Sequence, residues 1–201
     1  MGRPGTLRII SGSAGGLRLA YPKEVKIRPT ADRVREAVFN ILAGRADDAR
    51  VLDLFAGTGA YGLEALSRGA RRCTFVEKHH ACVAAIRDNL QKTHLAENAV
   101  VVSADAFAFV DRELPASEPF DLIFIDPPYR FSQDSSAGSK MAKLMAGLAT
   151  PGVLAAEGII ILEHASTAAV SEQIGPLRCY DRRNYGTTAV SFFGLASMDA
   201  A

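Results

Sequence analysis

Short apolar segments of strand length alternate with segments of helical period from Arg50 onward, and this alternation is the strongest constraint on the fold. Parallel strands that are buried on both faces and connected by helices produce such an alternation. The sequence therefore predicts an α/β protein whose mostly parallel sheet is covered by helices on both faces and ends in an antiparallel pair. The expected strands are residues 51–55, 73–77, 100–103, 121–126, 158–164, 178–185 and 188–195, and the expected helices are residues 59–68, 81–93 and 141–148.

A basic arm precedes this pattern. Residues 1–28 carry six Lys or Arg and one Glu, whereas the remaining residues carry 17 basic and 21 acidic side chains, so an arm of net charge +5 precedes a body of −4. Two short strands are expected in the arm, residues 7–11 and 17–21, around a glycine-rich turn. The basic side chains can bind an anionic partner or form a solvated face. They are Arg3, Arg8, Arg18, Lys23, Lys26 and Arg28.

A helix is expected after Pro29, because Thr30 can cap its N-terminus and apolar residues then recur at helical spacing until Gly44. We expect residues 1–28 to form an extension and residues 29–201 to form one domain. The apolar positions of the expected helix are Val34, Val38, Ile41 and Leu42.

A glycine-rich turn lies where the first strand of the body gives way to its first helix. Gly57, Gly59 and Gly62 match G-x-G-x-x-G, and Glu77 ends the second strand 24 residues after Asp53. Glycines let a ligand approach the backbone closely, and an acidic residue on the next strand can accept hydrogen bonds from ribose hydroxyls. The pattern predicts a nucleoside cofactor, although by itself it fits NAD-dependent dehydrogenases equally well.

Asp53 favours one class of cofactor. A carboxylate before the glycines would repel a pyrophosphate, whereas it can accept a hydrogen bond from the ammonium group of S-adenosylmethionine, whose sulfonium is also cationic. An aspartate here can also simply cap the turn. Asp105, after the third strand, can accept from the N6 amine of an adenine or cap the next helix. The expected cofactor-binding residues are Asp53, Phe55, Gly57, Gly59, Glu77, Asp105 and Ala106.

The apolar strand at residues 121–125 is followed by Asp126-Pro127-Pro128-Tyr129. A carboxylate, two residues without a backbone N–H and an aromatic ring form a site rich in hydrogen-bond acceptors with a stacking surface, which suits a planar base carrying an amino group. The tetrapeptide resembles the catalytic one of methyltransferases that modify exocyclic amines of nucleic-acid bases. Asp-Pro-Pro also ends strands and begins turns, so its context must decide.

The cysteines and histidines show no metal-binding spacing. Cys73, Cys82 and Cys179 are odd in number and form no C-x-x-C, and the four histidines fit no ligand pattern with them. The N-terminus has no apolar signal core, and no apolar stretch has membrane-spanning length. We therefore expect a cytoplasmic protein with free thiols, without a metal and without membrane association.

Six segments along the chain act together as a signature. They are residues 28–40 (RPTADRVREAVFN), 51–59 (VLDLFAGTG), 62–70 (GLEALSRGA), 75–77 (FVE), 126–129 (DPPY) and 185–188 (YGTT). Over nearly the whole chain they resemble the bacterial 16S ribosomal RNA guanine-N2 methyltransferases of the RsmD type. Tyr61, where the family has an aliphatic residue, and the serine-rich stretch 131–140 depart from the pattern and leave the target nucleotide open.

The resemblance implies a class I methyltransferase fold, with a seven-stranded sheet and an N-terminal extension. It implies S-adenosylmethionine as the methyl donor and a guanine of 16S ribosomal RNA, in the small subunit or its assembly intermediate, as the acceptor. It also implies that residues 28–40 pack over the cofactor, with Thr30 and Arg33 near its methionine carboxylate. We expect a monomer that binds RNA phosphates through the basic arm and Arg130.

The hypothesis for catalysis is that the Asp126 carboxylate and the Pro127 carbonyl hold the two N–H bonds of guanine N2 while Tyr129 stacks on the base. An adenine-N6 methyltransferase of DNA or RNA would share the tetrapeptide, and a ribosome-assembly factor could bind RNA and cofactor without turnover. The intact tetrapeptide favours catalysis, and the basic arm with residues 28–40 favours ribosomal RNA.

Overall fold

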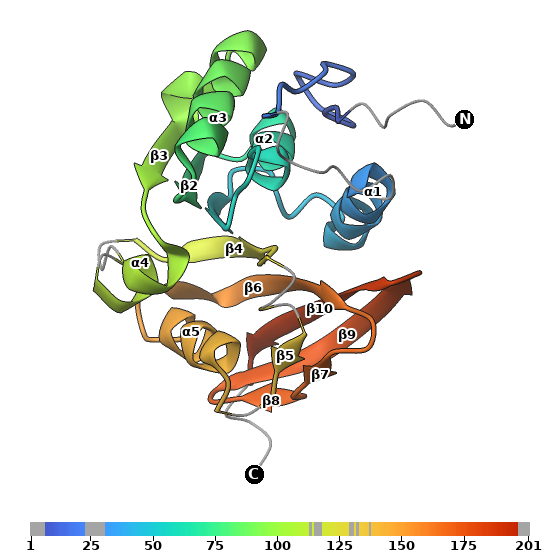
Figure 1. The fold of residues 1–201 in the computed structure, drawn as a ribbon, viewed down its shortest axis with the longest axis vertical. Helices are drawn as coiled ribbons and strands as arrows, with labels where there is room; N and C mark the ends of the chain where they lie inside the picture. The colour runs from blue at the N-terminus through green and yellow to red at the C-terminus, as the bar shows by residue number, and fades with distance from the viewer. Residues whose placement is uncertain are drawn as a thin grey trace. The chain divides into compact units, whose positions relative to one another are not determined.

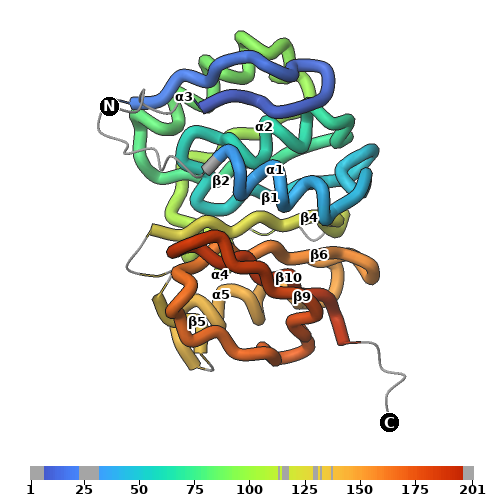
Figure 2. The backbone as a smooth tube through the Cα atoms, turned by 90° about the vertical axis from the view of Figure 1, so that its right-hand side faces the viewer, coloured from blue at the N-terminus to red at the C-terminus, as the bar shows by residue number. Residues whose placement is uncertain are grey.

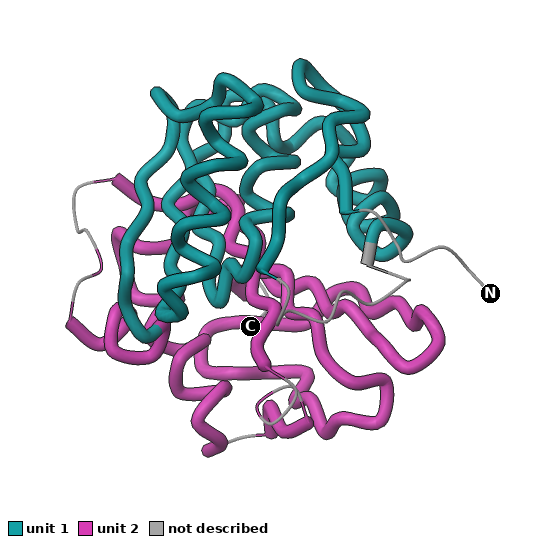
Figure 3. Tube along the Cα trace, turned by 45° about the horizontal axis from the view of Figure 1, so that its top comes forward, with its two compact units in different colours: residues 1–105 teal, residues 106–201 magenta. Residues whose placement is uncertain are grey.

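The computed structural model describes residues 7–22, 31–112, 114, 118–128, 131, 133–136 and 138–196. The chain forms two compact units, residues 1–105 and residues 106–201, shown in teal and magenta in Figure 3. The predicted boundary between an extension and a domain, at residues 28 and 29, lies outside the described residues and stays a prediction.

The first unit is built on three parallel strands in the order β3-β2-β1, of which β3 and β2 are labelled in Figure 1. The strands are β1 (Arg50–Leu54), β2 (Arg72–Glu77) and β3 (Ala99–Ser103). The helices are α1 (Ala31–Leu42), which precedes the strands, α2 (Ala60–Ser67) between β1 and β2, and α3 (His80–Thr93), which is followed by a short 3-10 turn (Ala96–Asn98) before β3. These elements confirm the predicted alternation of strands and helices. The apolar strand residues, such as Val51 and Leu52, are fully buried.

Residues 7–22 pack within the first unit along α2 and α3, as Figure 2 shows in dark blue. The Ala20 amide donates to Asn89 Oδ1 at 2.7 Å, and the Ser13 amide donates to the Ser67 carbonyl at 2.7 Å. The two predicted strands are reduced to a single antiparallel bridge between Arg8 and Arg18. The prediction was right about direction and wrong about extent, because the glycine-rich turn leaves only this pair in register.

The second unit combines parallel and antiparallel strands. β4 (Phe120–Ile125) runs parallel to β6 (Leu154–Ala165), which pairs antiparallel with β10 (Thr188–Leu195); β9 (Leu177–Tyr185) then pairs with β10 and with β8 (Gln173–Ile174). The helices are α4 (Ala106–Arg112) and α5 (Lys140–Leu148), and two short strands, β5 (Asp134–Ser135) and β7 (Ala169–Val170), pair separately.

Two features of the second unit bear on the predictions. The terminal antiparallel pair is confirmed, and Gly186 in its turn has a φ of 65°. β6 begins at Leu154 rather than at Gly158, because Leu154 already pairs with Phe120. The residues after Leu154 form an irregularity, and regular pairing resumes where Ile159 pairs with Leu122. With parallel strands linked by helices and an antiparallel end, the chain has the predicted α/β class of fold. Within the described residues, no helix has the length and apolar content needed to cross a bilayer.

Candidate functional site

The turn between β1 and α2 has the left-handed backbone that its glycines predict. Phe55, Gly57 and Gly59 have φ angles of 58°, 54° and 79°. A Cβ on Gly62 would lie 2.3 Å from Phe75 Cε1, so this glycine lets α2 pack closely on β2. Two glycines therefore shape the turn, and the third sets the distance between the helix and the sheet.

Glu77 lies against this turn at the end of β2. Its Oε2 accepts from the Gly57 amide at 2.9 Å, and its Oε1 accepts from the His79 amide at 2.8 Å. The side chain is buried, so its orientation is held by both contacts. The predicted acidic residue is thus placed directly beside the backbone of the glycine turn.

Asp53 is buried in β1 and faces the start of α2. Its Oδ2 accepts from the Gly62 amide at 2.9 Å, which is the turn-capping contact expected as the alternative explanation. Burial raises the pKa of Asp53 to about 8, the negative charge of Glu77 also raises it, and the hydrogen bond from Gly62 and the charge of Arg35 oppose the rise. A buried carboxyl group that holds its proton is stabilised as an anion when a cation binds beside it. The capping contact and a cofactor role are therefore compatible.

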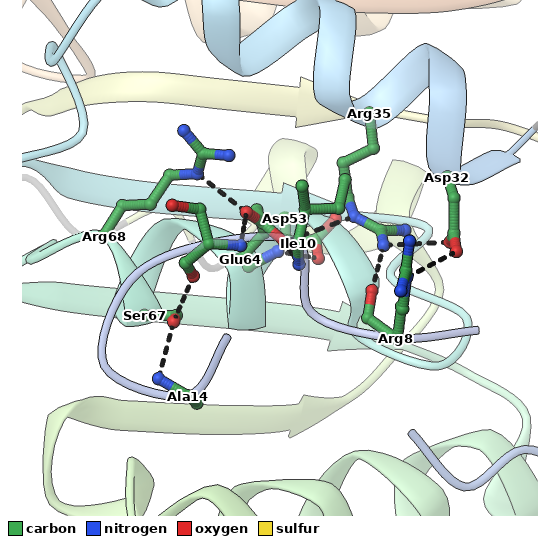
Figure 4. A network of polar contacts seen from close by, with 11 residues as sticks. Arg8, Ile10, Ala14, Asp32, Arg35, Asp53, Glu64, Ser67 and Arg68 are labelled. Carbon is green, nitrogen blue, oxygen red and sulfur yellow. Dashed lines mark hydrogen bonds and ion pairs between the residues drawn. The ribbon is translucent and has the colours of Figure 1, made fainter. Parts of the chain in front are cut away.

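A buried ion-pair network joins residues 7–14 to α1 and α2, and it was not predicted from the sequence (Figure 4). Glu64, fully buried, accepts from the Ile10 amide at 2.7 Å and from Arg68 Nε at 2.7 Å, and lies 3.6 Å from Arg35 Nε. Arg35, also buried, donates to the Arg8 carbonyl and to Asp32 Oδ1. Two pairs at helical spacing were local signals of this network: Asp32 with Arg35, three residues apart, and Glu64 with Arg68, four residues apart.

Asp105 follows β3 directly and is half-exposed. Its Oδ2 lies 3.2 Å from Lys78 Nζ, beside Glu77 at the end of the neighbouring strand. Ala106, which is buried, begins α4, so Asp105 occupies the position from which a helix cap would act.

The Asp126-Pro127-Pro128 turn lies at the end of a strand, as predicted, and directly follows its four buried residues 122–125. Asp126 is half-buried, Pro127 is buried and Pro128 is exposed. The Pro128 carbonyl accepts from the Phe131 amide at 2.8 Å and closes the turn. Tyr129, the last residue of the tetrapeptide, lies outside the described residues, as do Thr30 and the basic residues Arg3, Lys23, Lys26, Arg28 and Arg130.

Phe131 anchors this turn on the two helices of the second unit. Its ring meets that of Phe107, on α4, edge-on with centroids 5.0 Å apart. Lys140 Nζ, at the start of α5, lies 4.0 Å from the centroid of the Phe107 ring and 5.6 Å from that of Phe131. The sequence could not predict this cluster, because its three members come from different elements.

The described part of the basic arm keeps its charge at the surface. Arg8 and Arg18 are exposed and directly opposite each other, and Arg8 Nε lies 4.0 Å from Asp32 Oδ2. Arg33 is exposed in the first turn of α1. Cys73, Cys82 and Cys179 are free thiols, and among the described residues no three His, Cys, Asp or Glu side chains gather as metal ligands would.

Comparison with known proteins gives a consistent set of relatives. The family model described as conserved hypothetical protein 95 matches residues 7–194. YlbH of Bacillus subtilis (strain 168), whose name proposes an rRNA methyltransferase, is 33% identical over 187 residues, covering 93% of this chain and 98% of YlbH. Ribosomal RNA small subunit methyltransferase D of Escherichia coli (strain K12) is 44% identical over 126 residues, covering 63% of this chain and 62% of that protein. The solved structure of yhhF from Escherichia coli, named as a candidate methyltransferase, matches with a TM-score of 0.74 at 31% identity, covering 95% of this chain and 98% of that one.

Proposed function

Because the chain belongs to the family described as conserved hypothetical protein 95, the RsmD-type methyltransferases, we propose that it transfers a methyl group from S-adenosylmethionine to the exocyclic N2 amine of a guanine in 16S ribosomal RNA. The observation that carries the proposal is the Asp126-Pro127-Pro128 turn, which directly follows four buried residues of β4. The names of the relatives support an rRNA methyltransferase. The choice of guanine N2 rests on the six sequence segments that resemble the family.

The residues around the glycine turn fit S-adenosylmethionine better than a pyrophosphate cofactor. Asp53 and Glu77 are both buried at this turn, where a cation would favour the ionised form of Asp53 and the negative charge of a phosphate would oppose it. Asp53 would bind the ammonium group, and Glu77 would accept from the ribose hydroxyls. When bound, S-adenosylmethionine supplies an activated methyl group on a sulfonium, and its leaving group is a neutral thioether.

The catalytic turn would hold the amine by its hydrogens. The lone pair of guanine N2 is delocalised into the ring, so two acceptors must fix the N–H bonds and leave the lone pair directed at the methyl group. The Pro128 carbonyl already accepts the Phe131 amide, so we assign the two acceptors to Asp126 and the Pro127 carbonyl. As the N–C bond forms and the methyl–sulfur bond breaks, the amine becomes cationic, and it would then give one proton to the Asp126 carboxylate. Tyr129 would stack on the base.

Arg8 and Arg18 support an RNA partner. Like charges directly opposite each other on paired strands destabilise the pair, and an anion between them removes that cost. Phosphates would fill this role and would position the RNA without selecting its sequence. Since flipping a paired base costs a few kcal/mol, the target guanine is expected to be unpaired. It would lie in the small subunit or its assembly intermediate.

The test is transfer of a labelled methyl group to small ribosomal subunits from cells that lack the enzyme, followed by digestion to nucleosides. The proposal predicts N2-methylguanosine as the labelled product. N6-methyladenosine would instead establish an adenine methyltransferase. Label in neither nucleoside, with S-adenosylmethionine bound, would indicate a binding protein and refute the proposal.

A further inference from the structure

The register of the second unit places a second carboxylate beside the catalytic turn. β4 and β6 are parallel, and Phe124 pairs with Ile161 while Ile125 pairs with Leu162. Asp126 and Glu163 each follow this last pair by one residue. Side chains alternate between the faces of a sheet, and neighbouring strands lie about 4.8 Å apart. Continued by one residue beyond the last pair, this alternation puts Asp126, directly after β4, and Glu163, in β6, on the same face of the sheet.

Glu163 follows a buried run of β6 and is less buried than that run. In β6 it follows five buried residues, 158–162, and is itself half-buried, as Asp126 is after β4. Ligands of α/β sheets bind at the carboxyl ends of parallel strands, where both residues lie.

The strand on the other side of Glu163 is apolar at this level. Val190 of β10, which is fully buried, lies directly beside Glu163. Arg183 of β9 comes after Val190, and its Nε lies 3.0 Å from Asp181 Oδ1. Across the sheet, Glu163, Val190 and Arg183 therefore lie side by side on β6, β10 and β9. The acidic residue of this row is the one nearest to β4 and the catalytic turn.

We propose that Glu163 determines specificity for guanine by accepting a hydrogen bond from its N1–H while Asp126 and the Pro127 carbonyl hold the N2 amine. This inference rests on the proposed function. Guanine presents three N–H bonds along this edge, one on N1 and two on N2, and the site would offer three acceptors. An ionised carboxylate is an acceptor only. Adenine would bring the lone pair of its N1 against Glu163, so the same group that attracts guanine repels adenine.

The probe is an RNA in which the methylated guanine, once located, is replaced by 2-aminopurine. This base keeps the amine at C2, but its N1 carries a lone pair in place of a hydrogen. Wild-type enzyme is expected to prefer guanine by at least about 10-fold in kcat/KM, since sites built to bond a donor reject an analogue that lacks it. Glu163→Gln, which can turn either its oxygen or its N–H toward N1, is expected to methylate guanine more slowly and 2-aminopurine faster than wild type.

A gain with one substrate separates this role from damage to the fold. The control is Glu157→Gln, an exposed carboxylate at the other end of β6, which should leave the guanine preference unchanged. Equal losses on both substrates in Glu163→Gln, with the preference intact, would overturn the role of Glu163 alone. If wild-type enzyme forms no N2-methylguanine at all, the proposed function fails and this inference fails with it.

Discussion

Asp53→Asn is expected to stabilise the protein without ligand while it weakens S-adenosylmethionine binding. In the unfolded chain the Asp53 carboxyl group ionises at its ordinary pKa of 3.8, whereas burial raises its pKa in the folded protein to about 8. The folded protein therefore holds a proton that the unfolded chain has lost at neutral pH. The stability associated with this group is complete below the lower pKa and is lost as the pH rises toward the higher one.

The size of the effect follows from the two pKa values. A difference of one in pKa between the folded and unfolded states corresponds to about 1.36 kcal/mol, so burying Asp53 lowers the free energy of unfolding by about 4 kcal/mol between pH 4 and pH 7. Asparagine has no charge to lose and can still accept from the Gly62 amide. Its side chain also brings N–H donors into a buried site. Leaving these donors without acceptors is expected to lower the free energy of unfolding by about 1–3 kcal/mol at every pH.

Urea unfolding between pH 4 and pH 8 measures this directly. The difference in free energy of unfolding between Asp53→Asn and wild type is expected to grow by about 4 kcal/mol from pH 4 to pH 7 in favour of the variant. Asp88→Asn, an exposed carboxylate on α3, serves as the control and should show no such growth. A difference that stays constant within about 1 kcal/mol across this range would refute the reasoning. Calorimetry at pH 7 should also show that S-adenosylmethionine releases a proton from wild type and not from the variant.

Three further predictions concern other parts of the molecule. Glu77→Gln should weaken S-adenosylmethionine binding by about 10-fold or more in calorimetry, because a neutral amide accepts less strongly than a carboxylate; unchanged affinity would remove Glu77 from the site. Glu64→Ala leaves Arg35 without its buried counter-charge and should lower the free energy of unfolding by about 3–5 kcal/mol in urea; a loss below about 1 kcal/mol would mean that water replaces the pair. Arg8→Ala with Arg18→Ala should reduce the slope of log affinity for RNA against log salt by about 1–2, whereas Arg72→Ala, exposed at the start of β2, should not.

The parallel strands were predictable because each is a continuous apolar run between helices. β1, β2 and β3 begin or end within about one residue of the expected positions, as is typical of buried strands. β6 begins four residues before the predicted start, and this first part was not predictable because a register shift interrupts its pairing with β4. β5, β7 and β8 have two residues each, too few to show any period.

In the candidate site, too, contacts between residues close in sequence were predictable and contacts between distant residues were not. The glycine turn and Glu77 lie within one strand-helix-strand stretch, so local spacing was enough to predict that they meet. The burial of Arg35 depends on Glu64 and on the arm, which lie far away in the sequence, and a charged helical residue alone predicts exposure. The proposed role of Glu163 depends on the pairing of β4 with β6, which the sequence does not specify.

The role of the carboxyl end of β4 is tested most directly by the single-turnover rate of methyl transfer to small ribosomal subunits with Asp126→Ala. The variant is expected to bind S-adenosylmethionine within about 3-fold of wild type and to transfer the methyl group at least about 100-fold more slowly, as loss of a positioned electrostatic group requires. Asp111→Ala, an exposed carboxylate on α4, should transfer at the wild-type rate. A near-normal rate with Asp126→Ala would contradict the assignment of this turn as the catalytic site.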